Sequence, residues 1–136
     1  MSNQMTLEAL RSVPLFASLT DAAATELRDL LTIKNAGAGM QLVHKGDSGD
    51  AMYLIETGRV RISITDEDHQ EIILAELAQG DFFGEMSIID GRQRSADAIV
   101  IEDARLAVLS RTDFLAFVSS NADVALGMLG ALSDRL

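Results

Sequence analysis

The sequence predicts a mainly β fold with flanking α-helices, in which a jelly-roll-like antiparallel β-barrel lies between N-terminal and C-terminal helices. Two observations lead to this class. Helical spacing of apolar residues is confined to residues 1–32 and 111–136, at the two ends of the chain. Residues 33–110 instead form short β-type runs separated by turn residues, a pattern typical of barrels and sandwiches. At 136 residues, the chain is long enough for one such domain with a core.

The N-terminal region, residues 1–32, is expected to contain short helices at residues 6–11 and 21–31. Thr20 is suited to accept a hydrogen bond as the N-cap of the second helix. Pro14 lies between the two helices, where neither should continue. The second helix presents one apolar stripe, formed by Leu27, Leu30 and Leu31.

Six strands are expected in the barrel region. They are Met40–His44, Met52–Glu56, Arg59–Thr65, Gln70–Leu77, Ala96–Ile101 and Leu106–Leu109. Turn residues separate most of them, at Gly46–Gly49, Thr57–Gly58, Asp66–His69, Gly80–Asp81 and Asp90–Gly91. The third strand alternates in the manner of a half-buried antiparallel strand. Its apolar face would carry Val60, Ile62 and Ile64, and its polar face Arg59, Arg61 and Ser63.

The C-terminal region, residues 111–136, is expected to form two helices. One carries Phe114, Leu115, Phe117 and Val118. The other begins near Asn121 and has an apolar stripe formed by Ala125, Met128, Leu129, Leu132 and Leu136. No Gly or Pro stop signal follows this stripe. We therefore expect the natural chain to continue, and expect residues 121–136 to contact an effector domain or a homodimer partner.

The composition excludes several classes of function. The net charge is −10, with 11 basic residues against 21 acidic ones, so this chain alone is not expected to bind DNA or RNA. No apolar run approaches the roughly 18 residues of a membrane span, and no secretory signal is apparent; we expect no membrane contact by this chain alone. The chain contains no cysteine, which rules out disulfides and fits a cytoplasmic protein.

Residues 80–96 contain the groups that are best suited to bind a ligand. Gly84 allows a ligand to approach the backbone closely, and the N–H groups at the start of a short helix at residues 85–89 favour an anion. Arg94 is suited to form two parallel hydrogen bonds with a phosphate. Glu85 is an acceptor for sugar hydroxyl groups. Taken as isolated residues, Arg94 and Glu85 would more simply be interpreted as an ordinary surface ion pair.

The same stretch resembles a known family. Residues 83–89, Phe-Gly-Glu-Met-Ser-Ile-Ile, are followed after a short gap by Arg94, Ser95 and Ala96. This pattern is similar to the phosphate-binding cassette of cyclic-nucleotide-binding domains, which occur in catabolite activator proteins and protein kinase A regulatory subunits. Upstream, residues 42–47, 49–55 and 58–60 resemble the family's paired-strand turn. Together with the leading helices, the resemblance covers essentially all of residues 1–136.

The resemblance implies a role for each matched residue. Arg94 would hold the phosphate oxygens and Glu85 the ribose 2′-hydroxyl. Gly84, Met86 and Ala96 would line the phosphate and sugar through their backbone, next to Phe83. Ser95 stands where the family has Ser or Thr, and Ser favours cyclic AMP over cyclic GMP. The wall around sugar and base would be formed by Val43, Leu74 and Ala75.

The implied function is that of a regulatory sensor that binds cyclic AMP or cyclic GMP and transmits binding through a C-terminal helical lid, residues 111–136. Two alternatives stay open. The barrel is also compatible with a protein-interaction domain that has lost its ligand, or with the sensor half of a transcription regulator whose DNA-binding domain is absent.

No catalytic residue, metal ligand or cofactor is expected. His44 and His69 are isolated, whereas a barrel metalloenzyme needs a cluster of His and carboxylate ligands. Ser87 and Ser95 have no base nearby in the sequence. Asp97 would oppose a phosphate if it faced the site, but strand alternation from Arg94 predicts that it faces away.

Overall fold

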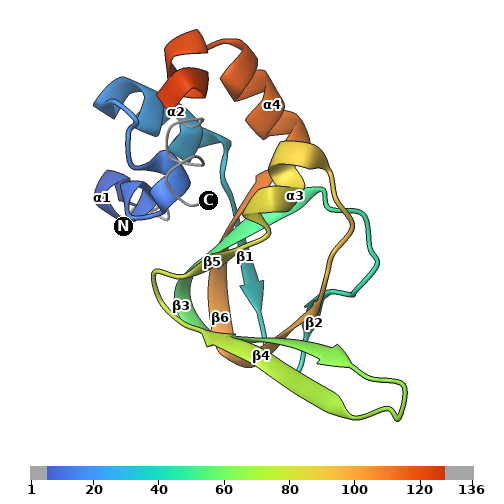
Figure 1. Ribbon diagram of the computed structural model, residues 1–136. Coiled ribbons are helices and arrows are strands. Elements are labelled where there is room, and N and C mark those ends of the chain that lie inside the picture. The colour runs from blue at the N-terminus through green and yellow to red at the C-terminus, as the bar shows by residue number, and fades with distance from the viewer. Residues whose placement is uncertain (1–5, 128–136) are drawn as a thin grey trace.

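The computed structural model describes residues 6–127, except for the side chain of Met86 (Figure 1). Short helices lie at the two ends of the described chain, and one sheet lies between them. The elements in order are α1 (Leu7–Arg11), a 3₁₀ turn η1 (Pro14–Phe16), α2 (Asp21–Leu30), β1 (Thr32–Ala36), β2 (Gln41–Val43), β3 (Ala51–Thr65), β4 (Glu71–Leu77), β5 (Phe82–Phe83), α3 (Glu85–Asp90), β6 (Asp97–Ser110) and α4 (Arg111–Ser119). Residues 122–127 are also helical.

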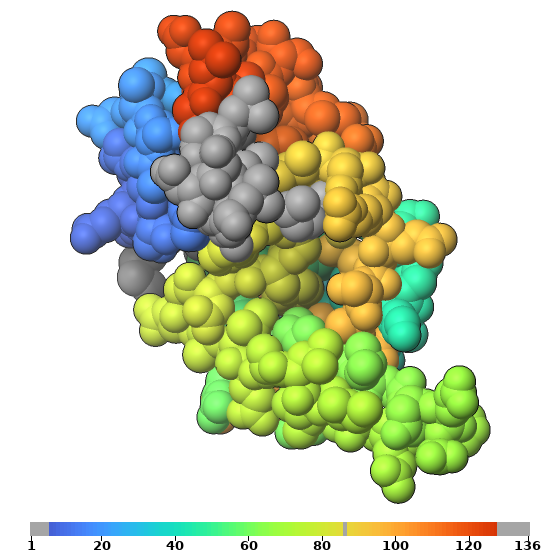
Figure 2. All heavy atoms as spheres, viewed as in Figure 1, coloured from blue at the N-terminus to red at the C-terminus, as the bar shows by residue number. Residues whose placement is uncertain are grey.

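The strands form one antiparallel sheet in the order β1-β6-β3-β4, with β2 paired to β6 and β5 paired to β3. This confirms the predicted fold class. The sheet curves strongly but is not closed between its edge strands β1 and β4 (Figure 1), so the word barrel applies only loosely. The β3–β4 hairpin projects from the body of the molecule, as the green lobe in Figure 2 shows.

Two pairs of predicted strands are each one long strand in the structure. Met52–Glu56 and Arg59–Thr65 lie within β3. Ala96–Ile101 and Leu106–Leu109 are joined in β6, which begins one residue later than predicted, at Asp97. The prediction of a turn at Thr57–Gly58 was wrong. The register shifts there instead, and Gly58 has a φ of +93° beside β6. A Cβ on Gly58 would lie 2.4 Å from the carbonyl oxygen of Asp103, so this glycine marks a bulge with close backbone approach.

β1 and β5 are two strands that were not predicted from the sequence. β1 has a mixed composition, Thr-Ile-Lys-Asn-Ala, and only Ala36 is buried, so it lacks a clear period of two. β5 has only two residues and is defined by its pairing of Phe82 and Phe83 with β3. Pairing across the sheet, rather than local pattern, makes both segments strands.

The side chains of β3 divide the core into two clusters. Met52 and Leu54 face the helices and pack with Leu10, Phe16 and Phe117. Tyr53 and Ile55 point to the other side of the strand and pack inside the curved sheet with a second group that includes Val60, Val100 and Leu106. Because successive side chains of a strand point to opposite faces, this one buried run joins the helices to the sheet.

The predicted alternation of Arg59–Thr65 holds only in part. Val60 is fully buried, as expected, but Ser63 is 1% exposed although it was assigned to the polar face. The register of the partner strand shifts at this point, since Ile62 pairs with Ala75 while Ser63 pairs with Ile73, which leaves Leu74 as the extra residue of a bulge on β4. The Ser63 hydroxyl donates to Glu71 Oε2 at 3.1 Å, which satisfies the buried polar group.

The flanking helices begin as predicted. Thr20 accepts from the backbone N–H of Ala23 and caps α2, whose Leu27 is fully buried. Ser110 caps α4 in the same way by accepting from Asp113 N–H. Phe114 and Phe117 of α4 are buried. Ala125 lies in the helical segment 122–127, whereas the rest of the predicted last stripe (Met128, Leu129, Leu132 and Leu136) lies outside the described residues. No helix within residues 6–127 is long and apolar enough to cross a bilayer.

Candidate ligand-binding site

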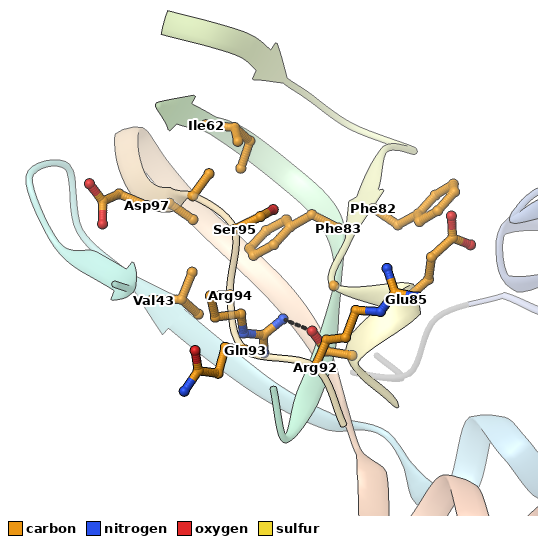
Figure 3. Close-up of a pocket in the computed structure, with 14 residues that line it drawn as sticks. Val43, Ile62, Phe82, Phe83, Glu85, Arg92, Gln93, Arg94, Ser95 and Asp97 are labelled. Carbon is orange, nitrogen blue, oxygen red and sulfur yellow. Dashed lines mark hydrogen bonds between the residues drawn. The ribbon is translucent and has the colours of Figure 1, made fainter. Parts of the chain in front are cut away.

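A cavity of about 380 Å³ opens where β5, α3 and the loop before β6 meet the inner face of the sheet (Figure 3). Its walls are formed by residues 82–85 and Ser87 from β5 and α3, residues 92–98 from the loop and the start of β6, Val43 from β2 and Ile62 from β3. This volume is in the range of about 300–1,000 Å³ that is usual for small-molecule sites. The residues of the suspected cassette therefore surround a space of the size of a small ligand.

Gly84 forms the tight connection between β5 and α3. Its φ is +85°, a conformation that residues with a Cβ rarely adopt. A Cβ at this position would lie 2.4 Å from Nη1 of Arg94 and 2.8 Å from the carbonyl oxygen of Ala51. The glycine thus allows the arginine side chain to lie directly against the backbone of the turn.

Arg94 is almost completely buried, with 6% of its surface exposed. Its Nη1 donates to the Ser87 hydroxyl at 3.3 Å (dashed line in Figure 3), and its Nη2 donates to the carbonyl oxygen of Ala51. The only carboxylate that residues 6–127 place within ion-pair distance is that of Asp50, at 4.0 Å with 85% of its side chain exposed. Within the same residues, Nε of Arg94 is buried and has no hydrogen-bond partner. The charge of Arg94 is therefore poorly compensated.

The loop that carries Arg94 is fixed by the turn at residues 44–50. Arg94 N–H donates to the carbonyl of Asp47, and Gly46 N–H donates to the carbonyl of Arg94, both at 2.8 Å. At Gly49, a Cβ would lie only 2.0 Å from the carbonyl oxygen of Arg92. These contacts explain physically why two motifs far apart in the sequence occur together, since the first motif supports the second.

Asp97 lines the cavity, although strand alternation predicted that it faces away from the site, but its carboxylate is turned away from the arginine. Its Oδ1 accepts from the backbone N–H of Lys45 at 2.7 Å. Figure 3 shows its carboxylate on the side of the loop opposite to the Arg94 guanidinium. The carboxylate thus stabilises the contact between the two motifs.

An aromatic pair lies beneath the cavity. Tyr53 of β3 pairs with Phe83 of β5, and their rings are stacked with centroids 4.8 Å apart and an interplanar angle of 11°. The guanidinium carbon of Arg94 lies 5.9 Å from the centroid of the Tyr53 ring. Burial raises the pKa of the Tyr53 phenol above its ordinary value; Arg94 acts to lower it and Asp50 to raise it. The phenol is therefore neutral at physiological pH.

Glu85 is the first residue of α3 and is 9% exposed. Figure 3 shows its carboxylate pointing away from the Arg94 guanidinium, on the side of Phe82. Both side chains are buried, so the alternative in which they form a surface ion pair does not describe this site.

The structure places most of the other predicted site residues at the cavity. Val43, Phe83, Ser95 and Ala96 line it together with Gly84, Glu85 and Arg94. The backbone of Met86 lies in α3. Leu74 and Ala75 are not among the lining residues, because they lie on the edge strand β4, where the bulge leaves Leu74 55% exposed. These two residues therefore do not line this cavity, and their role as a wall around sugar and base stays a prediction.

Several lining residues were missed in the sequence analysis, namely Ile62, Phe82, Ser87, Arg92, Gln93 and Ala98. Ile62 belongs to the alternating strand, but only its position opposite Ala98 across the sheet brings it to the cavity. Ser87 and Arg92 lie within the cassette segment, so their place in the motif was the available signal.

Residues 33–121 match the family model described as a cyclic nucleotide-binding domain. The chain belongs to this family. It is 41% identical over 98 residues to the Cyclic AMP receptor protein of Thermus thermophilus, covering 72% of this chain and 45% of that protein. Among solved structures, it is similar to the N-terminal domain of a transcriptional regulator from Streptomyces coelicolor, with a TM-score of 0.88, 31% identity, and coverage of 93% of this chain and 89% of that one.

A second solved structure, described as cAMP bound PfPKA-R, has a TM-score of 0.77 and 30% identity, over 82% of this chain and 39% of that one. The cyclic-nucleotide-binding domain thus occurs in proteins much longer than this sequence. The chain spans less than half the length of the curated relatives it matches, 45% of the Thermus protein and 32% of a cyclic nucleotide-gated potassium channel from Rhizobium etli. The resemblance noted in the sequence is confirmed, and the chain is a cyclic-nucleotide-binding regulatory domain.

Proposed function

We propose that this domain binds cyclic AMP in preference to cyclic GMP in the cavity between α3 and residues 92–98, and transmits binding through residues 111–136. The observation that carries the proposal is the buried guanidinium of Arg94. Removing a charge from water costs several kcal/mol unless a counter-charge compensates it. Within residues 6–127 the only ion-pair partner of Arg94 is the exposed Asp50 at 4.0 Å. A phosphate in the cavity supplies the missing counter-charge.

The geometry favours an anionic ligand at this point despite the net charge of −10. Arginine presents N–H groups in a planar arrangement that matches two oxygens of a phosphate. A metal ion is not favoured, because residues 6–127 contain no group of three His, Cys, Asp or Glu side chains that could hold one. The cavity therefore attracts its ligand through one buried cation.

Each cassette residue then has a role in the proposed complex. Arg94 binds the exocyclic phosphate oxygens and Glu85 accepts from the ribose 2′-hydroxyl. Gly84, Met86 and Ala96 provide backbone contacts to phosphate and sugar. Val43 and Phe83 provide apolar walls, as their position at the cavity supports. Leu74 and Ala75 contact the base only if the ligand extends toward β4, or if β4 moves inward when the ligand binds.

The preference for cyclic AMP depends on Ser95, which lies at the cavity wall. The Thermus relative is named a cyclic AMP receptor protein and one similar structure contains cAMP, whereas a cGMP-dependent protein kinase of Drosophila is also 34% identical over 94 residues. We expect Ser95→Thr to narrow the preference for cyclic AMP about fivefold, since one neutral hydrogen bond contributes about 1 kcal/mol. Calorimetric titration of the unchanged chain and of Ser95→Thr, each with cyclic AMP and with cyclic GMP, gives the ratio of the two affinities. A ratio that is the same in both proteins contradicts the role of Ser95.

A thermal-shift titration tests the proposed ligand. At a cyclic AMP concentration 100 times its dissociation constant, the folded state should gain about 2.7 kcal/mol, which raises the melting temperature of a domain of this size by several degrees. Cyclic GMP should need a higher concentration for the same shift. 5′-AMP, which has the same base but no cyclic phosphodiester, is the matched control and should stabilise least. Equal or absent shifts with all three nucleotides would mean that the domain does not sense a cyclic nucleotide.

Transmission is supported by the contact between the cassette and α4. α3 packs against α4, and the side chain of Arg111, the first residue of α4, lies against Gly91 at the end of α3, 3.3 Å from where a Cβ would be. Arg111 N–H also donates to the carbonyl of Asp50 at 2.7 Å. A ligand that shifts α3 must therefore change the contacts of α4.

Hydrogen exchange tests this transmission. Saturating cyclic AMP should change the exchange of backbone amides in residues 111–119 as well as those in the cassette. Inverting a 1:99 equilibrium between two states requires about 5.5 kcal/mol of differential affinity, and a charge-assisted phosphate contact is a suitable source. Protection that changes in the cassette alone would contradict transmission through α4.

A further inference from the structure

We propose that Tyr53 is the positioning residue for Arg94, and that its ring holds the guanidinium at the floor of the cavity in the orientation that receives a phosphate. This inference rests on the proposed function, because it assigns a role in the binding of the same ligand. Tyr53 is not part of the cassette motif and does not line the cavity. It would therefore act through Arg94 rather than by touching the nucleotide.

The ring of Tyr53 is a rigid support. It is 8% exposed and belongs to the buried cluster inside the curved sheet. Its partner across the strands is Phe83, stacked on it at 4.8 Å. A stacked cross-strand aromatic pair fixes both rings more firmly than area burial alone. Phe83 in turn is adjacent to Gly84, so the stack and the tight turn are parts of one unit.

The contact with the Tyr53 ring stabilises the charge of Arg94 without using its hydrogen-bond donors, which a carboxylate would occupy. The guanidinium lies 5.9 Å from the ring centroid, within the range in which an aromatic face attracts a cation. A contact with the ring face occupies none of the guanidinium N–H groups. A buried carboxylate would compensate the charge better but would compete with the phosphate for those same N–H groups. The ring thus stabilises the charge and leaves it available.

The charge state of the phenol fits this role. Burial raises the pKa of Tyr53, so the ring is present as the neutral phenol. The charged groups that act on it are Arg94, from the loop before β6, and Asp50, from the turn before β3. Because the face of the ring carries the interaction, the hydroxyl group is dispensable. Phenylalanine should therefore replace tyrosine here, whereas an aliphatic residue should not.

The first arm of the test is calorimetric titration of the 136-residue chain with cyclic AMP. Tyr53→Leu should weaken binding about tenfold, the size expected for loss of a desolvated cation–π contact, and Tyr53→Phe should bind within about twofold of the unchanged chain. Ile55→Ala is the matched control for packing damage, since Ile55 lies on the same strand and in the same buried cluster. It should lower the melting temperature yet leave the affinity unchanged. If Tyr53→Leu binds as tightly as the unchanged chain, or if Ile55→Ala loses as much affinity, the inference is overturned.

The second arm needs no ligand, and so separates a failure of this inference from a failure of the proposed function. Urea unfolding is measured for the unchanged chain, Tyr53→Leu, Arg94→Leu and the double variant. Tyr53→Leu should raise the unfolding equilibrium constant about tenfold more when Arg94 is present than in the Arg94→Leu background. Tyr53→Met replaces Tyr53→Leu if the latter does not unfold cooperatively. An equal factor in both backgrounds overturns the inference. A chain that shows the coupling but binds no cyclic nucleotide would support the positioning role and refute the proposed function.

Discussion

Arg94→Ala is expected to abolish measurable cyclic-nucleotide binding while the domain stays folded. The variant removes the only cation that residues 6–127 place in the cavity floor against Gly84. Two charge-assisted hydrogen bonds to a phosphate contribute about 1.5–3 kcal/mol each, so the affinity should fall by at least about 100-fold. Calorimetric titration with cyclic AMP, up to the highest soluble protein concentration, measures the loss.

The stability of the same variant gives an independent check. Because Arg94 is buried without a close counter-ion, its removal relieves a desolvation cost that offsets the lost packing. The urea midpoint should therefore change little. Arg59→Ala is the matched control, since Arg59 lies on the exposed face of β3, paired with Glu76 at 2.8 Å, and it should leave the affinity unchanged. Binding of cyclic AMP by Arg94→Ala at the affinity of the unchanged chain would refute the assignment of the site.

Gly84→Ala is expected to weaken cyclic-nucleotide binding by about 100-fold, although it adds only one methyl group. That methyl would lie 2.4 Å from Nη1 of Arg94, closer than any real contact, so the arginine or the turn must move by about 1 Å. A shift of this size removes at least one charged hydrogen bond to the phosphate, which costs up to about 3 kcal/mol. The measurement is again calorimetric titration with cyclic AMP.

Gly80→Ala is a closely matched control for this variant. Gly80 has a φ of +90°, almost that of Gly84 at +85°, but a Cβ on Gly80 would meet no atom within 4 Å. Both variants bear the same backbone strain of about 1–2 kcal/mol, and only Gly84→Ala moves Arg94. Gly84→Ala should lose more stability, because its Cβ would also lie 2.8 Å from the carbonyl oxygen of Ala51, but only Gly84→Ala should lose affinity. Equal affinities in the two variants would show that the close approach at Gly84 is irrelevant to binding.

The fold class and the ligand-binding segment, residues 80–96, could be predicted because both depend on local sequence patterns. Thr20 predicts the start of a helix because its side chain can cap the first turn, and that cap is confirmed. Gly84 and Arg94 belong to one short motif, and the structure brings them into direct contact. Only the short helix α3 and the turn after it separate them in the sequence.

Features that depend on pairing between distant segments were not predictable in the same way. Thr57–Gly58 has the composition of a turn, and only the backbone of Asp103 beside it shows that the strand continues through a bulge. The same holds for the burial of Ser63, whose hydroxyl is covered by Glu71 of the neighbouring strand β4. Leu74 and Ala75 were assigned to the pocket by motif position, but strand order places them at the edge of the sheet. The place of Tyr53 between Phe83 and Arg94 likewise depends on pairing between strands, which no local pattern encodes.

A crystal structure of the chain grown with saturating cyclic AMP tests the central claim most directly. We expect the nucleotide in the cavity beside α3, with its phosphate oxygens within hydrogen-bond distance of the Arg94 guanidinium and its ribose 2′-hydroxyl near Glu85. A nucleotide bound elsewhere, with the arginine still donating only to Ser87 and Ala51, would show that the buried cation does not serve a cyclic phosphodiester.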